Sequence, residues 1–168
     1  HLFRRALGEE VPEIALPSHD IPSMPINVEL PLSIGIPPEY IPDQELRLNL
    51  YRRIANLRSE EEITATAIEF SDRFGALPDQ VENLLLQMRI KLKAYKVGLS
   101  SITFENGQII LRYPQLPENI KQRNLPMVDP LVRPGKNAYW IALSNLKDES
   151  WQKFLPEVLQ KIELATAR

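Results

Sequence analysis

The sequence contains no cysteine and only two histidines, His1 and His19. The lack of cysteine excludes disulfide bonds, thiolate metal sites and cysteine nucleophiles, and it is typical of cytoplasmic proteins. With only two histidines, we expect neither a histidine-based metal centre nor a histidine proton relay. No apolar run approaches the roughly 20 residues that cross a bilayer. We therefore expect a cytoplasmic protein with no membrane contact and no bound cofactor.

A strong charge of either sign is also missing. The 20 basic and 22 acidic side chains give a formal net charge of -2, so the chain as a whole has no electrostatic attraction to nucleic acid. Contact with DNA would need a local basic patch. A length of 168 residues is typical of one domain with a well-filled core.

Motifs for common enzyme chemistry are missing as well. Gly135 and Lys136 do not form a phosphate-binding loop, because Asn137 follows them and Pro130 stands where the motif needs its first glycine. No Gly-x-Ser-x-Gly motif occurs. The acidic run Glu60–Glu62 is typical of a helix N-terminus, where the helix dipole favours carboxylates. We expect no enzymatic activity from this chain.

The N-terminal part is interpreted as a connector. Residues 2–7 are followed by a glycine and are typical of the last turns of a helix. The first residue is His1 instead of methionine, which suggests a piece of a longer protein. Eight of the 15 prolines lie in residues 11–42, and proline removes an amide donor and clashes in a helix interior. This stretch is therefore predicted to be extended.

A strand is predicted at residues 26–34, where apolar and polar positions alternate. Pro31 cannot donate a hydrogen bond to a neighbouring strand and confines this strand to a sheet edge. We expect residues 1–25 to be a helix remnant and proline-rich linker, and residues 26–168 to form one domain.

Two helices are predicted next. Asp43 is a suitable N-cap for the first helix. Ser59 and Glu62 form a capping-box motif that opens the second, and Gly75 ends it, because glycine tolerates positive φ. Apolar positions recur at helical spacing in both. Those expected in the core are Leu46, Leu50, Ile54, Leu57, Ile63, Ala67, Phe70 and Phe74.

A third helix is predicted from Pro78, a favourable first helical residue, to about Val97, before Gly98. Apolar residues occupy two sides of this helix, which predicts a central position. One of these stripes comprises Val81, Leu84, Leu85, Met88, Leu92 and Tyr95. The second comprises Leu86, Ile90 and Val97.

After Gly98 the spacing of the apolar residues changes from the helical period to alternation with polar residues. Asn106-Gly107 lies between two alternating segments, which predicts a β-hairpin because both residues accept positive φ. A further strand is expected at residues 138–143, after an irregular stretch over 114–137. Residues 150–165 predict a terminal helix that Pro156 kinks or splits. The predicted fold is α+β, a three-helix layer packed on a small, mainly antiparallel sheet.

Two groups of basic residues offer an alternative function as an accessory nucleic-acid-binding domain. Acidic neighbours dilute both groups, and few aromatic residues stand among them, in contrast to proteins that bind single strands. We therefore consider DNA contact by this chain the weaker interpretation. The first group, on the first predicted helix, is Arg47, Arg52, Arg53 and Arg58, and the second is Lys121, Arg123, Arg133 and Lys136.

Two carboxylates, Glu69 and Asp72, stand near the end of the second predicted helix, where the helix dipole favours cations instead. One interpretation is structural: Glu69 pairs with Arg73 at i,i+4 spacing, and Asp72 pairs with a neighbouring basic residue. The other is functional: the two acids form an anionic knob beside Gly75 that binds a basic partner. The residues alone leave both interpretations open.

The same region resembles a known family. The matching motifs are Tyr40-Ile41-Pro42-Asp43, the run from Arg47 to Ala55 and the run from Asp72 to Pro78. In residue types and spacing these motifs resemble the C-terminal domain of the bacterial transcription-repair coupling factors, the Mfd family. The resemblance covers residues 26–111 and weakens beyond Pro114.

The resemblance implies a regulatory role by docking. Members of the family are ATP-driven DNA translocases that displace stalled RNA polymerase and recruit UvrA through a UvrB-like module. Their C-terminal domain packs on that module and masks its UvrA-binding surface until polymerase is engaged. By this resemblance, Glu69 and Asp72 match the family's docking surface, with Arg73 as a weaker candidate beside them. UvrA and RNA polymerase would then be indirect partners.

Overall fold

The computed structural model describes residues 25–147 and 149–166, and these residues form two compact units. Leu32–Arg89 make up the first unit, and residues 25–31 and those from Ile90 onward make up the second. The predicted helix at residues 2–7 and nearly all of the predicted linker lie outside the described residues. The prediction of one domain over 26–168 stays a prediction.

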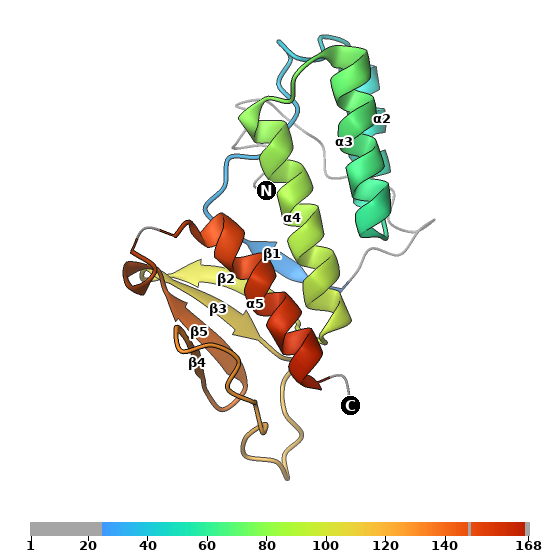
Figure 1. Cartoon of the computed structure of the whole chain (residues 1–168). Helices are drawn as coiled ribbons and strands as arrows, with labels where there is room; N and C mark the ends of the chain where they lie inside the picture. Colours follow the sequence, from blue (N-terminus) through green and yellow to red (C-terminus); the bar gives the residue numbers. More distant parts are fainter. Residues whose placement is uncertain (1–24, 148, 167–168) are drawn as a thin grey trace. The chain divides into compact units, whose positions relative to one another are not determined.

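The first unit contains the predicted helical layer. Its helices are α2 (Gln44–Ala55), α3 (Glu60–Phe74) and α4 (Asp79–Lys96), of which α4 belongs to this unit as far as Arg89. Figure 1 shows α2 and α3 side by side. Their burial follows the predicted spacing, with Leu50, Ile54, Ile63 and Phe70 almost completely buried.

The predicted helix caps are present. Asp43 Oδ1 accepts a hydrogen bond from the Glu45 amide at 3.0 Å, and Ser59 Oγ accepts one from the Glu62 amide at 3.1 Å. The Glu62 carboxylate accepts from the amide of Arg58 at 2.6 Å, one residue before the position that a capping box uses. These bonds satisfy amides that a helix start leaves without partners.

The extended segment before α2 is part of the first core. Its described part, residues 25–43, has no helix, as the prolines predict, and Ile34, Ile36 and Ile41 are each at most 2% exposed. The Ile36 amide donates to the Tyr51 hydroxyl at 2.7 Å, and the Gly35 amide donates to the Gln80 carbonyl at 3.2 Å. The segment is thus bound to both α2 and α4.

The second unit contains a five-stranded sheet in the order β1-β2-β3-β5-β4. The strands are β1 (Asn27–Glu29), β2 (Ser101–Glu105), β3 (Gln108–Arg112), β4 (Val132–Pro134) and β5 (Ala138–Ala142). The β1 strand pairs with β2 in parallel, and the other pairs are antiparallel. A short 3-10 helix, η2 (Leu143–Asn145), and α5 (Trp151–Thr166) follow. The structure confirms the α+β class and the mainly antiparallel sheet.

One face of this sheet is covered by a helix. Figure 1 shows α5 lying across the strands. Val158, Leu159 and Ile162 of α5 are completely buried, as are Tyr139 and Ile141 of β5. Burial of apolar area on this scale is the main stabilising term in folding. No helix among the described residues has both the length and the apolar character that a membrane span requires.

The hairpin and the edge strand were predicted correctly. Asn106 and Gly107 both have positive φ, 53° and 75°, as the two-residue turn between β2 and β3 requires. The β1 strand lies at a sheet edge and ends before Pro31, so it is shorter than predicted. Gly75 ends α3 with φ 95°, in a conformation that other residues rarely adopt.

Some expectations were wrong. The irregular stretch over 114–137 contains the short strand β4. Pro156 lies inside the single helix α5, so the alternative of two helices was wrong, whereas a kink at Pro156 stays a prediction. Phe154 and Leu155 before the proline are buried, and so are Val158 and Leu159 after it. Their packing offsets the helix-breaking effect of Pro156. Tyr95 was expected in the α4 core stripe, but its side chain is 53% exposed.

Candidate protein-docking surface

The C-terminal end of α3 is held by Tyr40. Its hydroxyl donates to the Gly75 carbonyl at 2.8 Å and lies 3.2 Å from the Phe70 carbonyl. Carbonyls in the last turn of a helix have no partner within the helix, so this contact caps the end of α3. Burial raises the pKa of Tyr40 above its usual value of 10.0.

Aromatic rings fix the same helix end. The Phe74 ring packs edge to face against Tyr40 and Phe70, with centroid separations of 5.9 and 5.8 Å. The Arg73 guanidinium lies over the Phe74 ring, 4.8 Å from its centroid. Phe70 is completely buried, whereas Phe74 is only partly buried. The last turn of α3 is therefore a well-packed support for the side chains on its surface.

Glu69 is engaged by two arginines. It accepts from Arg73 Nη1 at 2.9 Å, the i,i+4 pair of the structural interpretation, and from Arg53 Nη1 at 2.8 Å. A second hydrogen bond joins Arg53 Nη2 to the other carboxylate oxygen. The hydrogen bonds from Arg53 and Arg73 lower the pKa of Glu69 from 4.5 to about 2. Two positive charges thus surround the Glu69 carboxylate, and its ion pair with Arg53 links α3 to α2.

Asp72 is the carboxylate that remains available. It is exposed, and its side chain forms no hydrogen bond or ion pair with the residues that the structure describes. The structural interpretation expected Asp72 to pair with a neighbouring basic residue, and no such pair is present among the described residues. The nearby helix end adds partial negative charge from its carbonyls. Asp72 can therefore attract a cation that comes from another molecule or module.

Asp72 belongs to an exposed stripe along α3, which we call the outer stripe. At spacings of four, three and four residues, its members are Glu61, Ala65, Ile68 and Asp72, and all four are exposed. Ile68 is 58% exposed, and the Glu61 side chain, like that of Asp72, has no partner among the described residues. The outer stripe presents two apolar side chains, Ala65 and Ile68, between two carboxylates that have no partner among the described residues.

The outer stripe combines features of a docking surface. Its apolar centre offers area that is removed from water on contact, and its charged ends favour a partner of opposite charge. Ile68 is not among the residues predicted from the sequence to take part in docking. The pattern that could have indicated it is an isoleucine on the side of the helix opposite the buried Ile63 and Phe70.

The basic residues of α2 have other functions within the fold. Arg47 is 6% exposed and donates to the carbonyls of Ile41 and Pro42 at 2.8 and 3.0 Å. Arg53 binds Glu69, and Arg58, three residues after the end of α2, donates to the carbonyls of Ala55 and Leu57. Arg52 contacts Asn49 at 3.1 Å. These contacts occupy the α2 arginines and weigh against their use on a phosphate backbone.

Of the second group of basic residues, two contact aromatic rings within the fold and two are exposed. The Arg123 guanidinium donates to Asn137 Oδ1 at 2.9 Å and stacks on Tyr113 at 4.8 Å. Arg133 lies over Trp140, 5.4 Å from the ring centroid. Lys121 and Lys136 are exposed. Within residues 25–147 and 149–166, no group of three or more His, Asp or Glu residues could hold a metal ion.

Comparison with known proteins gives consistent results. A model of the family described as "TRCF domain" matches residues 30–123. The transcription-repair-coupling factor of Rickettsia prowazekii is 34% identical over 107 residues, which cover 64% of this chain and 9% of that protein. The corresponding protein of Escherichia coli is 37% identical over 92 residues, which cover 54% of this chain and 8% of that protein.

A solved structure has the same fold. It is described as the C-terminal domain of a transcription-repair coupling factor and superposes with a TM-score of 0.64 at 18% identity. The match covers 84% of this chain and 95% of that chain. The chain spans about a tenth of the length of the curated relatives that it matches.

Proposed function

The chain belongs to the TRCF domain family, and from this premise we propose that it is an autoinhibitory docking domain of a transcription-repair coupling factor. In this proposal it binds the UvrB-like module of the same parent chain and masks that module's UvrA-binding surface. The parent is a cytoplasmic, ATP-dependent DNA translocase that releases stalled RNA polymerase and recruits UvrA. This chain contributes regulation and no chemistry.

The docking contact is assigned to the outer stripe of α3, and the unpaired carboxylate of Asp72 is the observation that carries the assignment. An exposed carboxylate without a partner loses no existing contact when a basic side chain binds it. Ile68 lies one helical turn before Asp72, so the same partner surface can bury an apolar contact beside the ion pair. The complementary surface is therefore basic at its edges and apolar at its centre.

Glu69 and Arg73 have a different role in this proposal. The ion pair between Glu69 and Arg53 joins α3 to α2, and the pair between Glu69 and Arg73 lies within α3. Together they hold the outer stripe on a rigid support. Glu69 contributes to docking by position, and Asp72 by direct contact. Arg73 lies over Phe74 as well, and its replacement disturbs the same support.

The strength of the contact suits a switch. An exposed ion pair contributes about 0.2 to 1 kcal/mol, and burial of an isoleucine side chain contributes roughly 1.5 to 3 kcal/mol at most. A docked state built from a few such contacts is favoured but can be displaced by competing contacts elsewhere in the parent. Only undocked molecules bind UvrA, so the apparent affinity for UvrA equals the intrinsic affinity multiplied by the undocked fraction.

The test uses the full-length parent with Asp72→Asn, which removes the charge and keeps the size. We expect tighter UvrA binding and a higher ATPase rate in the absence of polymerase. Ile68→Ala should act in the same direction, because it removes the apolar contact. Glu118→Gln is the matched control, since Glu118 is an exposed carboxylate outside α3.

Unchanged UvrA affinity in the Asp72→Asn, Ile68→Ala double variant would contradict the assignment of the outer stripe. An increase of the same size in Glu118→Gln would show a nonspecific charge effect and would contradict it as well. Glu69→Ala separates the two roles. It should raise UvrA affinity and also lower the thermal stability of the domain, whereas Asp72→Asn should leave stability unchanged.

A further inference from the structure

The second unit has a sheet face that differs in character from the face covered by α5. The register pairs Trp140 of β5 with Ile110 of β3 and with Arg133 of β4. Directly paired residues have side chains on the same face of a sheet. Arg112 of β3 pairs with Ala138 and shares this face. The alternate positions, which include Tyr139 and Ile141, lie on the face that α5 covers.

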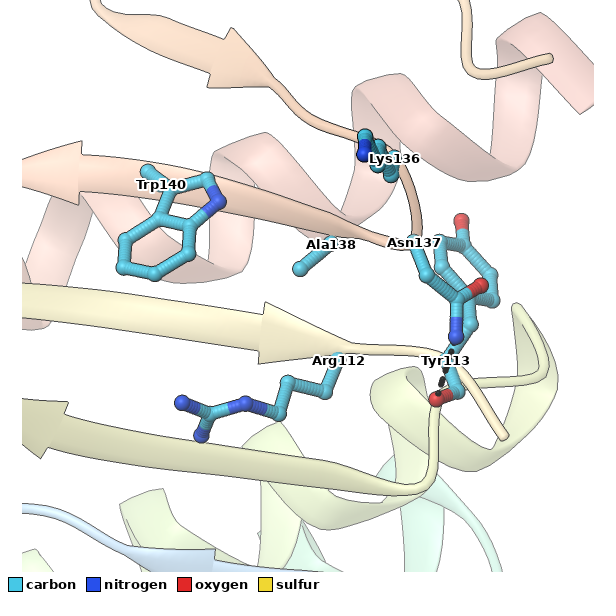
Figure 2. Close-up of a pocket in the computed structure, with 6 residues that line it drawn as sticks. All are labelled: Arg112, Tyr113, Lys136, Asn137, Ala138 and Trp140. Atoms are coloured by element: carbon cyan, nitrogen blue, oxygen red, sulfur yellow. Dashed lines mark hydrogen bonds between the residues drawn. The ribbon is translucent and has the colours of Figure 1, made fainter. Parts of the chain in front are cut away.

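Two shallow hollows flank Trp140 on this surface. The first, of about 440 Å³, is lined by Arg112, Tyr113, Lys136, Asn137, Ala138 and Trp140, and Figure 2 shows these side chains around the strand ends. The second, of about 300 Å³, has Trp140, Met127, Leu131 and Ala142 among its lining residues. Both hollows are open, whereas small-molecule sites enclose most of their ligand. Their shape suits single side chains of a larger partner.

The side chains that line the two hollows carry positive charge only, although Glu105 lies on the same face of the sheet. Arg112, Arg133 and Lys136 line the two hollows, and no Asp or Glu is among the described residues that line them. Arg112 is partly balanced by Glu105, 3.2 Å away. Arg133 and Lys136 are exposed, and neither has a carboxylate partner among the residues described. The chain as a whole has a net charge of -2, so the positive charge of these hollows is a local feature.

Trp140 is held in place by its neighbours. A Cβ atom added to Gly135 would lie 3.0 Å from the indole Nε1 of Trp140, so the glycine lets the ring approach the backbone. The Arg133 guanidinium lies over the ring, 5.4 Å from its centroid. The indole N–H has no acceptor among the described residues. Trp140 thus combines a fixed apolar surface with a free hydrogen-bond donor.

We propose that this surface, which we call the tryptophan face (Arg112, Arg133, Lys136 and Trp140), binds an acidic segment of a partner protein. Apolar side chains of the segment contact Trp140 and enter the two hollows. Its carboxylates pair with Arg133 and Lys136 and accept from the indole N–H. Aromatic residues with neighbouring arginine are typical centres of protein interfaces. A single tryptophan gives a nucleic-acid strand only one base to stack on, which favours a peptide over a single strand.

The experiment measures binding of a labelled peptide that repeats the order Asp-Leu-Glu-Phe to the 168-residue chain by fluorescence anisotropy. A second peptide has the order Asn-Leu-Gln-Phe, and a labelled oligothymidylate represents single-stranded nucleic acid. We expect the acidic peptide to bind with a Kd below about 1 mM. The amide peptide should bind at least about tenfold more weakly, because it loses the charge pairs.

Variants locate the site. Arg133→Gln with Lys136→Gln, and separately Trp140→Leu, should each weaken the acidic peptide at least about tenfold. Gly135→Ala should weaken it less, since the indole must shift by a few tenths of an ångström. Lys121→Gln is the matched control, because Lys121 is exposed but lines neither hollow. Circular dichroism confirms that each variant remains folded.

Three results with the unmodified chain would overturn the proposal. They are no measurable binding of the acidic peptide, equal binding of the amide peptide, and tighter binding of oligothymidylate. Loss of binding in Lys121→Gln equal to that in the double variant would also overturn it, since the effect would then be general charge. The tryptophan face and the outer stripe are tested with different variants, so either proposal can fail alone.

Discussion

Replacing Phe70 by alanine removes the aromatic side chain at the centre of the first unit's core. Phe70 is 0% exposed, and its ring contacts the Phe74 ring edge to face at 5.8 Å. Truncation of a fully buried phenylalanine costs about 3 to 5 kcal/mol, because both transfer free energy and packing are lost. At about 2 to 4 °C per kcal/mol for a protein of this size, the thermal midpoint should fall by roughly 6 to 20 °C.

The comparison variant is Phe74→Ala. The helical spacing places Phe74 in the core beside Phe70, which predicts an equal loss. In the structure Phe74 is only partly buried, so water can fill the space that its ring leaves. We expect a loss of about 1 to 2 kcal/mol, from part of its apolar area and its ring contacts. Urea unfolding followed by circular dichroism gives both values, and equal losses for the two variants would refute this reasoning.

Three further predictions concern stability. Because the pKa of Glu69 falls from 4.5 to about 2 on folding, its contribution is complete above about pH 4.5 and is lost as the pH falls towards 2. The difference in urea midpoint between the wild type and Glu69→Gln should therefore shrink over that range, and a constant difference would contradict it. Tyr40→Phe removes the hydrogen bond to the Gly75 carbonyl and should lower the free energy of unfolding by about 0.5 to 1.5 kcal/mol. Pro156→Ala restores an amide donor to the Gln152 carbonyl inside α5 and should raise the thermal midpoint, with a gain of up to about 3 kcal/mol.

The elements that could be predicted correctly are those with local causes. The caps at Asp43 and Ser59 depend on side chains within three residues of the amides that they accept from. The turn at Asn106-Gly107 depends on two residues that tolerate positive φ. Such signals are complete within a short stretch of sequence, so tertiary contacts are not needed to recognise them.

The errors arose where distant contacts decide the outcome. The β4 strand is three residues long and contains Pro134, so its own sequence has little strand character. Pairing with β5 across a short turn creates it. Of the two alternatives for Pro156, a split of the terminal helix was wrong, because α5 is a single helix. The side chains of α5 are buried against the sheet, and this contact cannot be predicted from the sequence around Pro156 alone.

The contacts of the two acids at the end of α3 could be predicted in part. The i,i+4 pair between Glu69 and Arg73 follows from helical spacing, and the structure contains it. The second partner of Glu69, Arg53, lies sixteen residues earlier on another helix, and no local rule connects the two. This long-range pair distinguishes the two acids. Glu69 is balanced by two arginines, whereas Asp72 remains available for docking.

The central claim is that the outer stripe of α3 docks on the UvrB-like module through Asp72. Calorimetric titration of this chain with that module, at low and high salt, tests it most directly. The account predicts binding that weakens with salt, and a loss of about fivefold in Asp72→Asn, the equivalent of roughly 1 kcal/mol. Glu118→Gln should bind as the wild type does. Equal affinities of Asp72→Asn and wild type, unaffected by salt, would contradict the claim.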